Sequence, residues 1–284
     1  MVNVRAPQAQ TIPFVFSSPH SGTNYPADFL EQSRLDALSI RRSEDSFVDE
    51  LFGAAPDLGA PLLRALFPRA YLDPNREPYE LDPGMFADAL PAHVNTRSLR
   101  VAGGLGTIAR VVSDGAEIYR GKLPWAEAER RIAACYHPYH QNLEGLLKET
   151  RQQFGMAILV DCHSMPSIGG PQDLDPGHGR PDIVLGDRFG NACSLRVVET
   201  ATRILTGLGY VVARNDPYAG GYITHHWGRP GQGFHALQIE LKRGLYMDED
   251  AITRGPRFEA VKASMTEFMR QMADGDWSSL ARRF

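Results

Sequence analysis

Met156-Ala-Ile-Leu-Val160, followed at once by Asp161-Cys-His-Ser164, is the clearest structural signal in the sequence. Five consecutive apolar residues that end in a polar cluster are typical of a strand that is buried on both faces. Strands of this kind belong to parallel sheets that carry helices on both sides. The segment therefore indicates an α/β fold.

The remainder of the chain alternates strand and helix patterns. Strands are expected at 14–18, 61–66, 182–185, 210–214 and 236–241, and helices at 43–55, 124–151, 190–208 and 257–272. Pro138 is expected to kink the longest of these helices in its middle. The regions 69–92 and 166–180 are rich in Pro, Gly, Asp and Asn and are predicted to be loops. The alternation predicts one domain over residues 1–284, built on a largely parallel sheet with both faces covered.

Composition excludes several classes of protein. Of the 284 residues, 43% are hydrophobic and 23% charged, which is ordinary for a globular chain. The net charge of −4, without blocks of like charge, argues against nucleic-acid binding. No apolar run approaches the roughly 18 residues that cross a bilayer, and the first residues lack a signal-peptide pattern. The three cysteines have no C-x-x-C spacing, so we expect a cytoplasmic protein in which Cys162 is a buried structural thiol.

Polar residues at strand ends are the candidates for a functional site. Ligands of open α/β sheets bind beyond the carboxyl ends of the strands, where His20 and His163 are expected. Glu240 lies within an apolar strand, and a buried carboxylate needs a metal, an arginine or a role in proton transfer. Two histidines and one carboxylate are a common catalytic zinc set that leaves a position for water. A strand-end histidine can also be a hydrogen-bonded structural residue, so the residues alone leave both interpretations open.

The acidic ligand has two candidates, Glu44 and Asp45, which precede the apolar face of the predicted 43–55 helix. Helical neighbours differ by about 100°, and the centre of that face lies nearer Glu44. Asp45 can instead be a helix N-cap, a frequent role for aspartate. Only one of the two can easily reach a metal that the histidines hold.

Two loops supply candidates for substrate binding. One holds a polar cluster of Arg69, Asp73, Asn75 and Arg76, and a guanidinium there offers two-point recognition of a carboxylate. The alternative is a surface arginine paired with a neighbouring acid. The other loop, 217–228, contains aromatics, two histidines and Gly220-Gly221, which permits close approach of the backbone to a ligand. It is either a loop that covers the substrate or a turn with surface aromatics.

Six short motifs then occur in a fixed order: Ser18-Pro-His-Ser-Gly22, Glu44-Asp45 with Val48-Asp49, Asp73-x-Asn75-Arg76, Asp161-Cys-His-Ser164, Gly220-Gly-Tyr-Ile-Thr224 and Gln238-x-Glu240. With them the chain resembles the N-formylglutamate amidohydrolase (N-formylglutamate deformylase) family from about residue 12 to residue 250. That family is similar to zinc carboxypeptidases and acyl-amino-acid deacylases. The resemblance implies a three-layer α/β/α sandwich around a mixed, largely parallel sheet.

The resemblance also implies roles for individual residues. His20, the acidic residue and His163 would bind Zn²⁺, Arg76 would grip a substrate carboxylate, and Glu240 would be the general base. Asp45, four residues before Asp49, fits the register of the family better than Glu44 and is the predicted ligand. We further expect Arg69 to assist Arg76, and the amino-acid part of the substrate to contact Asn75, Tyr222 and His226.

The predicted reaction is hydrolysis of N-formyl-L-glutamate to formate and L-glutamate, a step of histidine degradation. Two positions differ from the residues that family members of that pathway usually carry. They are Pro74, and His225 before His226-Trp227. These differences concern the identity of the substrate rather than the type of reaction. The alternatives are a deacylase or small peptidase of the same fold that acts on another N-acyl amino acid, and a non-catalytic binder of an acidic metabolite. His and Asp ligands also suit Fe, Mn or Co. The sequence predicts no oligomeric state.

Overall fold

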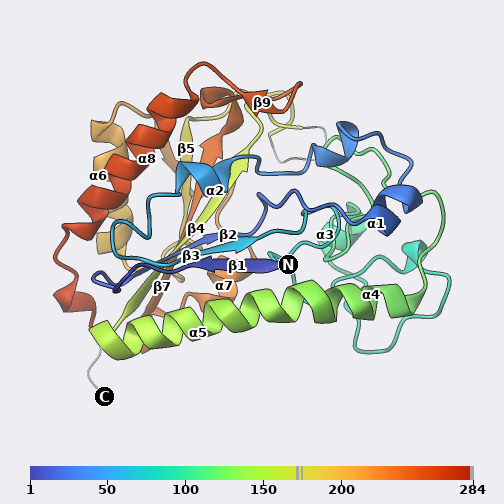
Figure 1. Cartoon of the computed structure of the whole chain (residues 1–284), viewed down its shortest axis with the longest axis horizontal. Helices are drawn as coiled ribbons and strands as arrows, with labels where there is room; N and C mark the ends of the chain where they lie inside the picture. The colour runs from blue at the N-terminus through green and yellow to red at the C-terminus, as the bar shows by residue number, and fades with distance from the viewer. Residues whose placement is uncertain (171–172, 174, 282–284) are drawn as a thin grey trace.

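A mixed β-sheet forms the centre of the computed structural model, which describes residues 1–170, 173 and 175–281 (Figure 1). Within this described part the seven strands lie in the order β1-β3-β2-β4-β7-β5-β6. Neighbouring strands are parallel except for β1 with β3 and β5 with β7, so the predicted mixed, largely parallel sheet is confirmed. The strands are β1 (Val2–Arg5), β2 (Phe14–Ser18), β3 (Leu62–Ala65), β4 (Ala157–Met165), β5 (Ile183–Gly186), β6 (Val212–Arg214) and β7 (Phe234–Lys242).

Helices cover both faces of this sheet (Figure 1). α6 and α8 lie together over one face with the short α2, and α5 runs along the other, which gives the expected three layers. The helices are α1 (Ala27–Gln32), α2 (Val48–Leu51), α3 (Leu99–Ala102), α4 (Trp125–Arg131), α5 (His137–Phe154), α6 (Leu195–Gly207), α7 (Tyr222–Trp227) and α8 (Phe258–Ala273). A small hairpin of β8 (Met247–Asp248) and β9 (Thr253–Arg254) lies outside the main sheet.

The two hydrophobic cores follow the alternation of side chains along the strands. On β4, Ile158 and Val160 pack in the core under α6 and α8, whereas Ala157 and Leu159 pack on the α5 side. The same alternation carries Asp161 and His163 to the α5 side of the sheet. β7 is the parallel neighbour of β4, and its Glu240 is the register partner of His163. The polar ends of two central strands therefore face the same side.

β4 is longer than the sequence indicates. The strand continues from the apolar run through Met165, and all nine of its residues are buried. Asp161 and His163 are consequently strand residues rather than loop residues, and the sheet fixes their backbones. The predicted loop at 166–180 includes residues 171, 172 and 174, which lie outside the described part of the chain.

The helix predicted at 43–55 is wrong at both ends, because α2 covers only Val48–Leu51. Phe47 has a φ of 67°, in the left-handed region, and a right-handed helix cannot pass through such a residue. Glu44 and Asp45 therefore precede the helix in a non-helical segment. The helical-angle argument that favoured Glu44 does not apply there.

The long helix predicted at 124–151 is interrupted, though not by a simple proline kink. A π-helical turn at Ile132–Tyr136 separates α4 from α5, and Pro138 falls in the first turn of α5. Proline lacks an N–H donor and its ring crowds the preceding turn, so a change of hydrogen-bond pattern just before it accommodates the ring. No helix in the described part of the chain is long and apolar enough to span a membrane.

Candidate functional site

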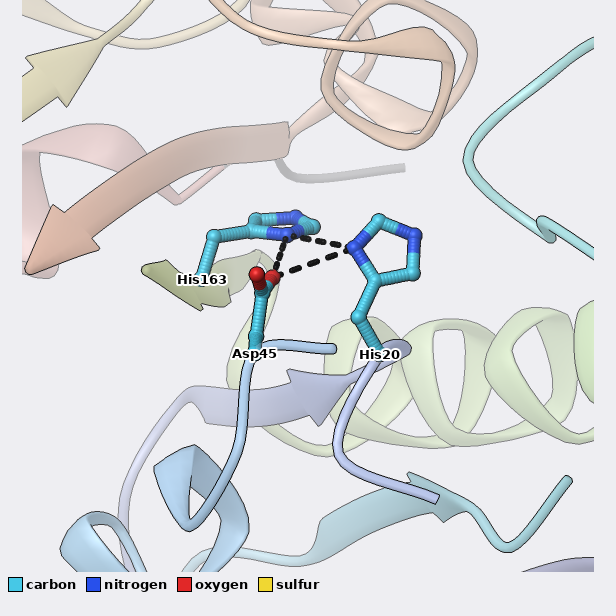
Figure 2. Close-up of side chains that lie close together, drawn as sticks. All are labelled: His20, Asp45 and His163. Carbon is cyan, nitrogen blue, oxygen red and sulfur yellow. Dashed lines mark hydrogen bonds and ion pairs between the residues drawn. The ribbon is translucent and has the colours of Figure 1, made fainter. Parts of the chain in front are cut away.

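His20, Asp45 and His163 meet beyond the ends of the central strands (Figure 2). His20 follows β2, Asp45 precedes α2, and His163 lies on β4. The Nδ1 atoms of His20 and His163 and the Oδ2 atom of Asp45 are each 3.1 Å from the other two. All three side chains are buried. We call them the His-Asp-His group.

Carboxylates hold the outer nitrogens of both imidazoles. His20 Nε2 lies 2.7 Å from Asp73 Oδ1, and His163 Nε2 lies 2.9 Å from Asp161 Oδ2. A carboxylate partner places the imidazole proton on Nε2 and leaves the Nδ1 lone pair free for a cation, an arrangement typical of metal-ligating histidines. Two such lone pairs and the Oδ2 atom of Asp45 point at one another in the group. Three acceptor atoms at this spacing favour a positive charge between them.

The electrostatics of the group agree with this geometry. Burial disfavours the charged imidazolium, but the Asp161 and Asp45 carboxylates outweigh it and hold the pKa of His163 well above its ordinary value. Burial also opposes ionisation of Asp45, yet hydrogen bonds with His163 and His20 keep its pKa well below the usual range. Surroundings that favour positive charge on an imidazole also favour a metal cation at the same point.

The donor set fits a divalent metal ion. Tetrahedral zinc takes nitrogen and oxygen ligands at about 2.0–2.2 Å, which places the ligand atoms roughly 3.3–3.5 Å from one another. The observed separations of 3.1 Å are close to that value. Imidazole and carboxylate ligands also suit Fe, Mn and Co, so the group could hold any of these ions.

Asp45, and not Glu44, is the acid that the structure brings to the histidines. The backbone N–H of Asp45 donates to the carbonyl of His20 at 3.1 Å, which holds the segment against the end of β2. Glu44 belongs to a separate network, because its carboxylate accepts hydrogen bonds from Tyr25 at 2.6 Å and from Arg41 at 3.0 Å. The choice between the two acids thus depends on a turn rather than on helical periodicity.

Glu240 lies beside the His-Asp-His group on β7. Its Oε1 accepts a hydrogen bond of 2.9 Å from the Gln238 side chain, two residues earlier on the same face of the strand. Burial raises the pKa of Glu240 to about 7; the Asp45 charge adds to this, while His163 and Arg69 oppose it. A carboxyl group with a pKa near neutrality can both accept and return a proton at physiological pH.

Two arginines join the site through Asp73. Arg69 Nε donates to Asp73 Oδ2 at 3.0 Å, and Arg76 Nη2 lies 3.5 Å from the same oxygen. Arg76 is buried and gives its Nε and Nη1 donors to the carbonyls of Leu105 and Asn75. Burial lowers the pKa of Arg76 to about 10, which leaves it charged at neutral pH. Asp73 therefore connects the metal-ligating candidate His20 with both predicted carboxylate-binding residues.

Gly221 and α7 are joined to the site by hydrogen bonds with Gln238 and Asn75. Asn75 Oδ1 accepts the backbone N–H of Ile223 at 2.8 Å, so the predicted Asn75 and α7 are in direct contact. A β-carbon at Gly221 would lie 2.4 Å from the Asn75 amide nitrogen, and this close approach requires glycine. On α7, Tyr222 and His226 stack with their ring centroids 5.0 Å apart and share a hydrogen bond.

The sequence of this chain matches that of a known protein family over most of its length. A family model described as N-formylglutamate amidohydrolase matches residues 12–247, a range that includes the His-Asp-His group, both arginines, α7 and Glu240. The chain belongs to the N-formylglutamate amidohydrolase family. The predicted family is thereby confirmed, and with it the assignment to the amidohydrolases.

Individual relatives of this amidohydrolase cover most of its length. The N-formylglutamate deformylase of Pseudomonas aeruginosa is 31% identical and is matched over 92% of each chain. The deformylase of Pseudomonas putida is 29% identical, over 84% of this chain and 83% of its own. A crystal structure of N-formylglutamate amidohydrolase from Ralstonia eutropha JMP134 superposes with a TM-score of 0.88 at 36% identity, and covers 96% of this chain and 97% of its own.

Sequence reasoning missed the outer contacts of the site in this family member. Asp161 was read as part of a motif, but its hydrogen bond to His163 was not foreseen, and neither was that of Gln238 to Glu240. The spacing held a usable signal, because residues two apart on a strand point to the same face. Cys162, between Asp161 and His163, points to the other face and is a buried, free thiol, as expected.

Proposed function

We propose that this amidohydrolase cleaves the formyl amide bond of N-formyl-L-glutamate to give formate and L-glutamate, with a divalent metal, Zn²⁺, held by the His-Asp-His group. The names of the relatives from Pseudomonas support the substrate. One observation carries the chemistry: three acceptor atoms converge at 3.1 Å beside a carboxyl group whose pKa is near 7.

Glu240 is the residue that moves the proton in this proposal. A cation at the His-Asp-His group would polarise the formyl carbonyl and lower the pKa of the attacking water. The ionised Glu240 accepts the proton of that water as its oxygen attacks the formyl carbon. The protonated Glu240 then gives the proton to the amine nitrogen as the C–N bond breaks, so the base returns to its starting state.

The arginines and α7 bind the amino-acid part of the substrate. Among the described residues, no hydrogen bond involves the terminal nitrogens of Arg69, and its side chain is partly exposed. These two nitrogens can therefore donate to both oxygens of a substrate carboxylate. Arg76 gives Nε and Nη1 to backbone carbonyls and pairs Nη2 with Asp73, so it contributes mainly a second positive charge. Asn75, Tyr222 and His226 complete the binding wall.

Substrate choice is tested with purified protein and a panel of N-formyl and N-acetyl amino acids. We expect N-formyl-L-glutamate to have the highest kcat/KM, because two arginines face a substrate with two carboxylates. N-formyl-L-glutamine and N-formyl-L-leucine are the matched controls for charge. Higher kcat/KM for a neutral N-acyl amino acid, or for a dipeptide, would instead favour the other deacylases or peptidases of this fold.

The rate is expected to depend on pH through Glu240. The pKa of this group is raised from the ordinary 4.5 to about 7 in the metal-free site, and the base acts only when ionised. A bound cation favours the carboxylate, so kcat/KM of the metal-loaded enzyme is expected to fall as the pH drops below about 7. We expect one acid limb in profiles recorded from about pH 5 to about pH 9 with saturating metal. A kcat/KM that does not decrease toward acidic pH while the metal stays bound would contradict the assignment.

Gly221→Ala is expected to raise KM by at least roughly tenfold, because small displacements of a positioning side chain are costly. The new β-carbon would meet the Asn75 amide at 2.4 Å and push it from its contact with α7. Gly231→Ala is the matched control, since nothing lies within 4 Å of a β-carbon there. Steady-state kinetics of both variants measure the effect, and equal KM values would show that the Asn75 position is unimportant.

A further inference from the structure

Arg243 is a buried arginine that contacts the acidic residue of the His-Asp-His group. It directly follows β7, three residues after Glu240. Its Nη2 donates to Asp45 Oδ1 at 3.1 Å, its Nε to the Ser164 hydroxyl at 3.2 Å, and its Nη1 to the Arg42 carbonyl at 3.2 Å. All three nitrogens of the guanidinium are therefore in use.

These contacts give the two oxygens of Asp45 different roles. Oδ2 lies 3.1 Å from both Nδ1 atoms of the histidines. Oδ1 points away and accepts from Arg243 at 3.1 Å and from the Ser164 hydroxyl at 3.4 Å. We propose that Arg243, directly and through the Ser164 hydroxyl, is a positioning residue that makes Asp45 a metal ligand through one oxygen only. This inference rests on the proposed metal-binding role of the group.

The same guanidinium fixes three separate segments relative to one another. Arg42 belongs to the segment that leads to Asp45, and Ser164 follows His163 on β4. Arg243 itself is anchored at the end of β7. The planar guanidinium group of arginine can donate to three acceptors in one fixed geometry, whereas the ammonium group of lysine is a point charge on a flexible chain. The arginine thus sets where Asp45 lies with respect to His163 and the base.

Charge and orientation predict opposite effects here. The positive charge of Arg243 competes with a cation for the charge of Asp45, so charge alone would weaken metal binding. The orientation that Arg243 imposes on the Asp45 carboxylate would strengthen metal binding, because it keeps Oδ2 directed toward the two imidazoles. Outer contacts that orient metal ligands typically change metal affinity 10- to 100-fold when they are removed.

The test measures metal affinity rather than turnover. Metal-free wild type, Arg243→Lys and Arg243→Gln are titrated with Zn²⁺ against a chromophoric chelator, and the absorption spectrum of the Co²⁺ form reports the number of ligand atoms. Arg254→Lys is the matched control, because that arginine is exposed and pairs with Glu50 outside the site. We expect Arg243→Lys, which keeps the charge, to bind Zn²⁺ roughly 10- to 100-fold more weakly and to change the Co²⁺ spectrum.

Each outcome is decisive. Wild-type or tighter Zn²⁺ binding by Arg243→Lys, with an unchanged Co²⁺ spectrum, would overturn the inference but not the proposed function. Failure of the wild type to bind Zn²⁺ or Co²⁺ would overturn the proposed metal site and this inference together. If thermal unfolding shows that the Arg243 variants do not fold, Ser164→Ala decides: about threefold or more weakening supports the network, and unchanged affinity contradicts it.

Discussion

Glu240→Gln is expected to lower kcat for N-formyl-L-glutamate by roughly 10²- to 10⁴-fold, the usual contribution of a general acid-base group. The amide of glutamine has nearly the same shape, and it can still accept from Gln238, but it cannot take a proton from water. Among the described residues no hydrogen bond or ion pair joins Glu240 to the His-Asp-His group, and its hydrogen-bond partner is Gln238. Metal content should therefore stay at the wild-type level, and KM should change little.

The measurement is steady-state kinetics together with elemental analysis of the same samples. Glu267→Gln is the matched control, because Glu267 is a partly exposed residue of α8 that pairs with Arg270. The acid limb of the pH profile should also disappear from the residual activity of Glu240→Gln. Near-normal turnover by this variant with metal bound would show that another group is the base.

His163→Ala is expected to abolish both metal binding and activity. The substitution removes one of three converging atoms and leaves Asp161 buried without its 2.9 Å partner. Loss of a ligand should weaken Zn²⁺ affinity by more than the roughly 100-fold that outer contacts reach. His20→Ala should act in the same way, because its Nδ1 atom occupies an equivalent place in the group.

Zn²⁺ titration of the metal-free proteins measures this loss. His93→Ala is the control, since His93 is exposed and its ring packs against Tyr79 and Trp125. Thermal unfolding of the metal-free forms separates loss of the ligand from loss of the fold. A His163→Ala protein that folds and retains wild-type Zn²⁺ affinity would mean that the metal, if any, binds elsewhere.

The sequence was sufficient to predict the inner residues that come from regular strands. Apolar runs identify β2, β4 and β7, and the rule that ligands lie beyond strand ends then selects His20 and His163. Glu240 is selected because a carboxylate inside an apolar strand needs a partner or a role. The structure brings these together because β4 lies between β2 and β7. The order of the strands was not predictable from local patterns, but the carboxyl ends of parallel strands meet at one edge of the sheet whatever their order.

Features that depend on tertiary structure could not be predicted in this way. The left-handed Phe47 delays the start of α2 to Val48, and the non-helical segment before it brings Asp45, instead of Glu44, to the histidines. Arg243 and Asp45 are 198 positions apart in the sequence, and no local sequence pattern predicts that two such distant residues form a hydrogen bond. The ordered family motifs found Asp45 because they carry information that helical periodicity lacks.

Metal content and deformylase activity, measured on one preparation before and after chelation, test the central claim most directly. We expect about one Zn²⁺ or equivalent divalent ion per chain, since the group offers one set of ligands. Chelation should remove this ion together with the hydrolysis of N-formyl-L-glutamate, and adding Zn²⁺ should restore both. Full deformylase activity in protein from which chelation has removed all metal would show that the His-Asp-His group is not a catalytic metal site.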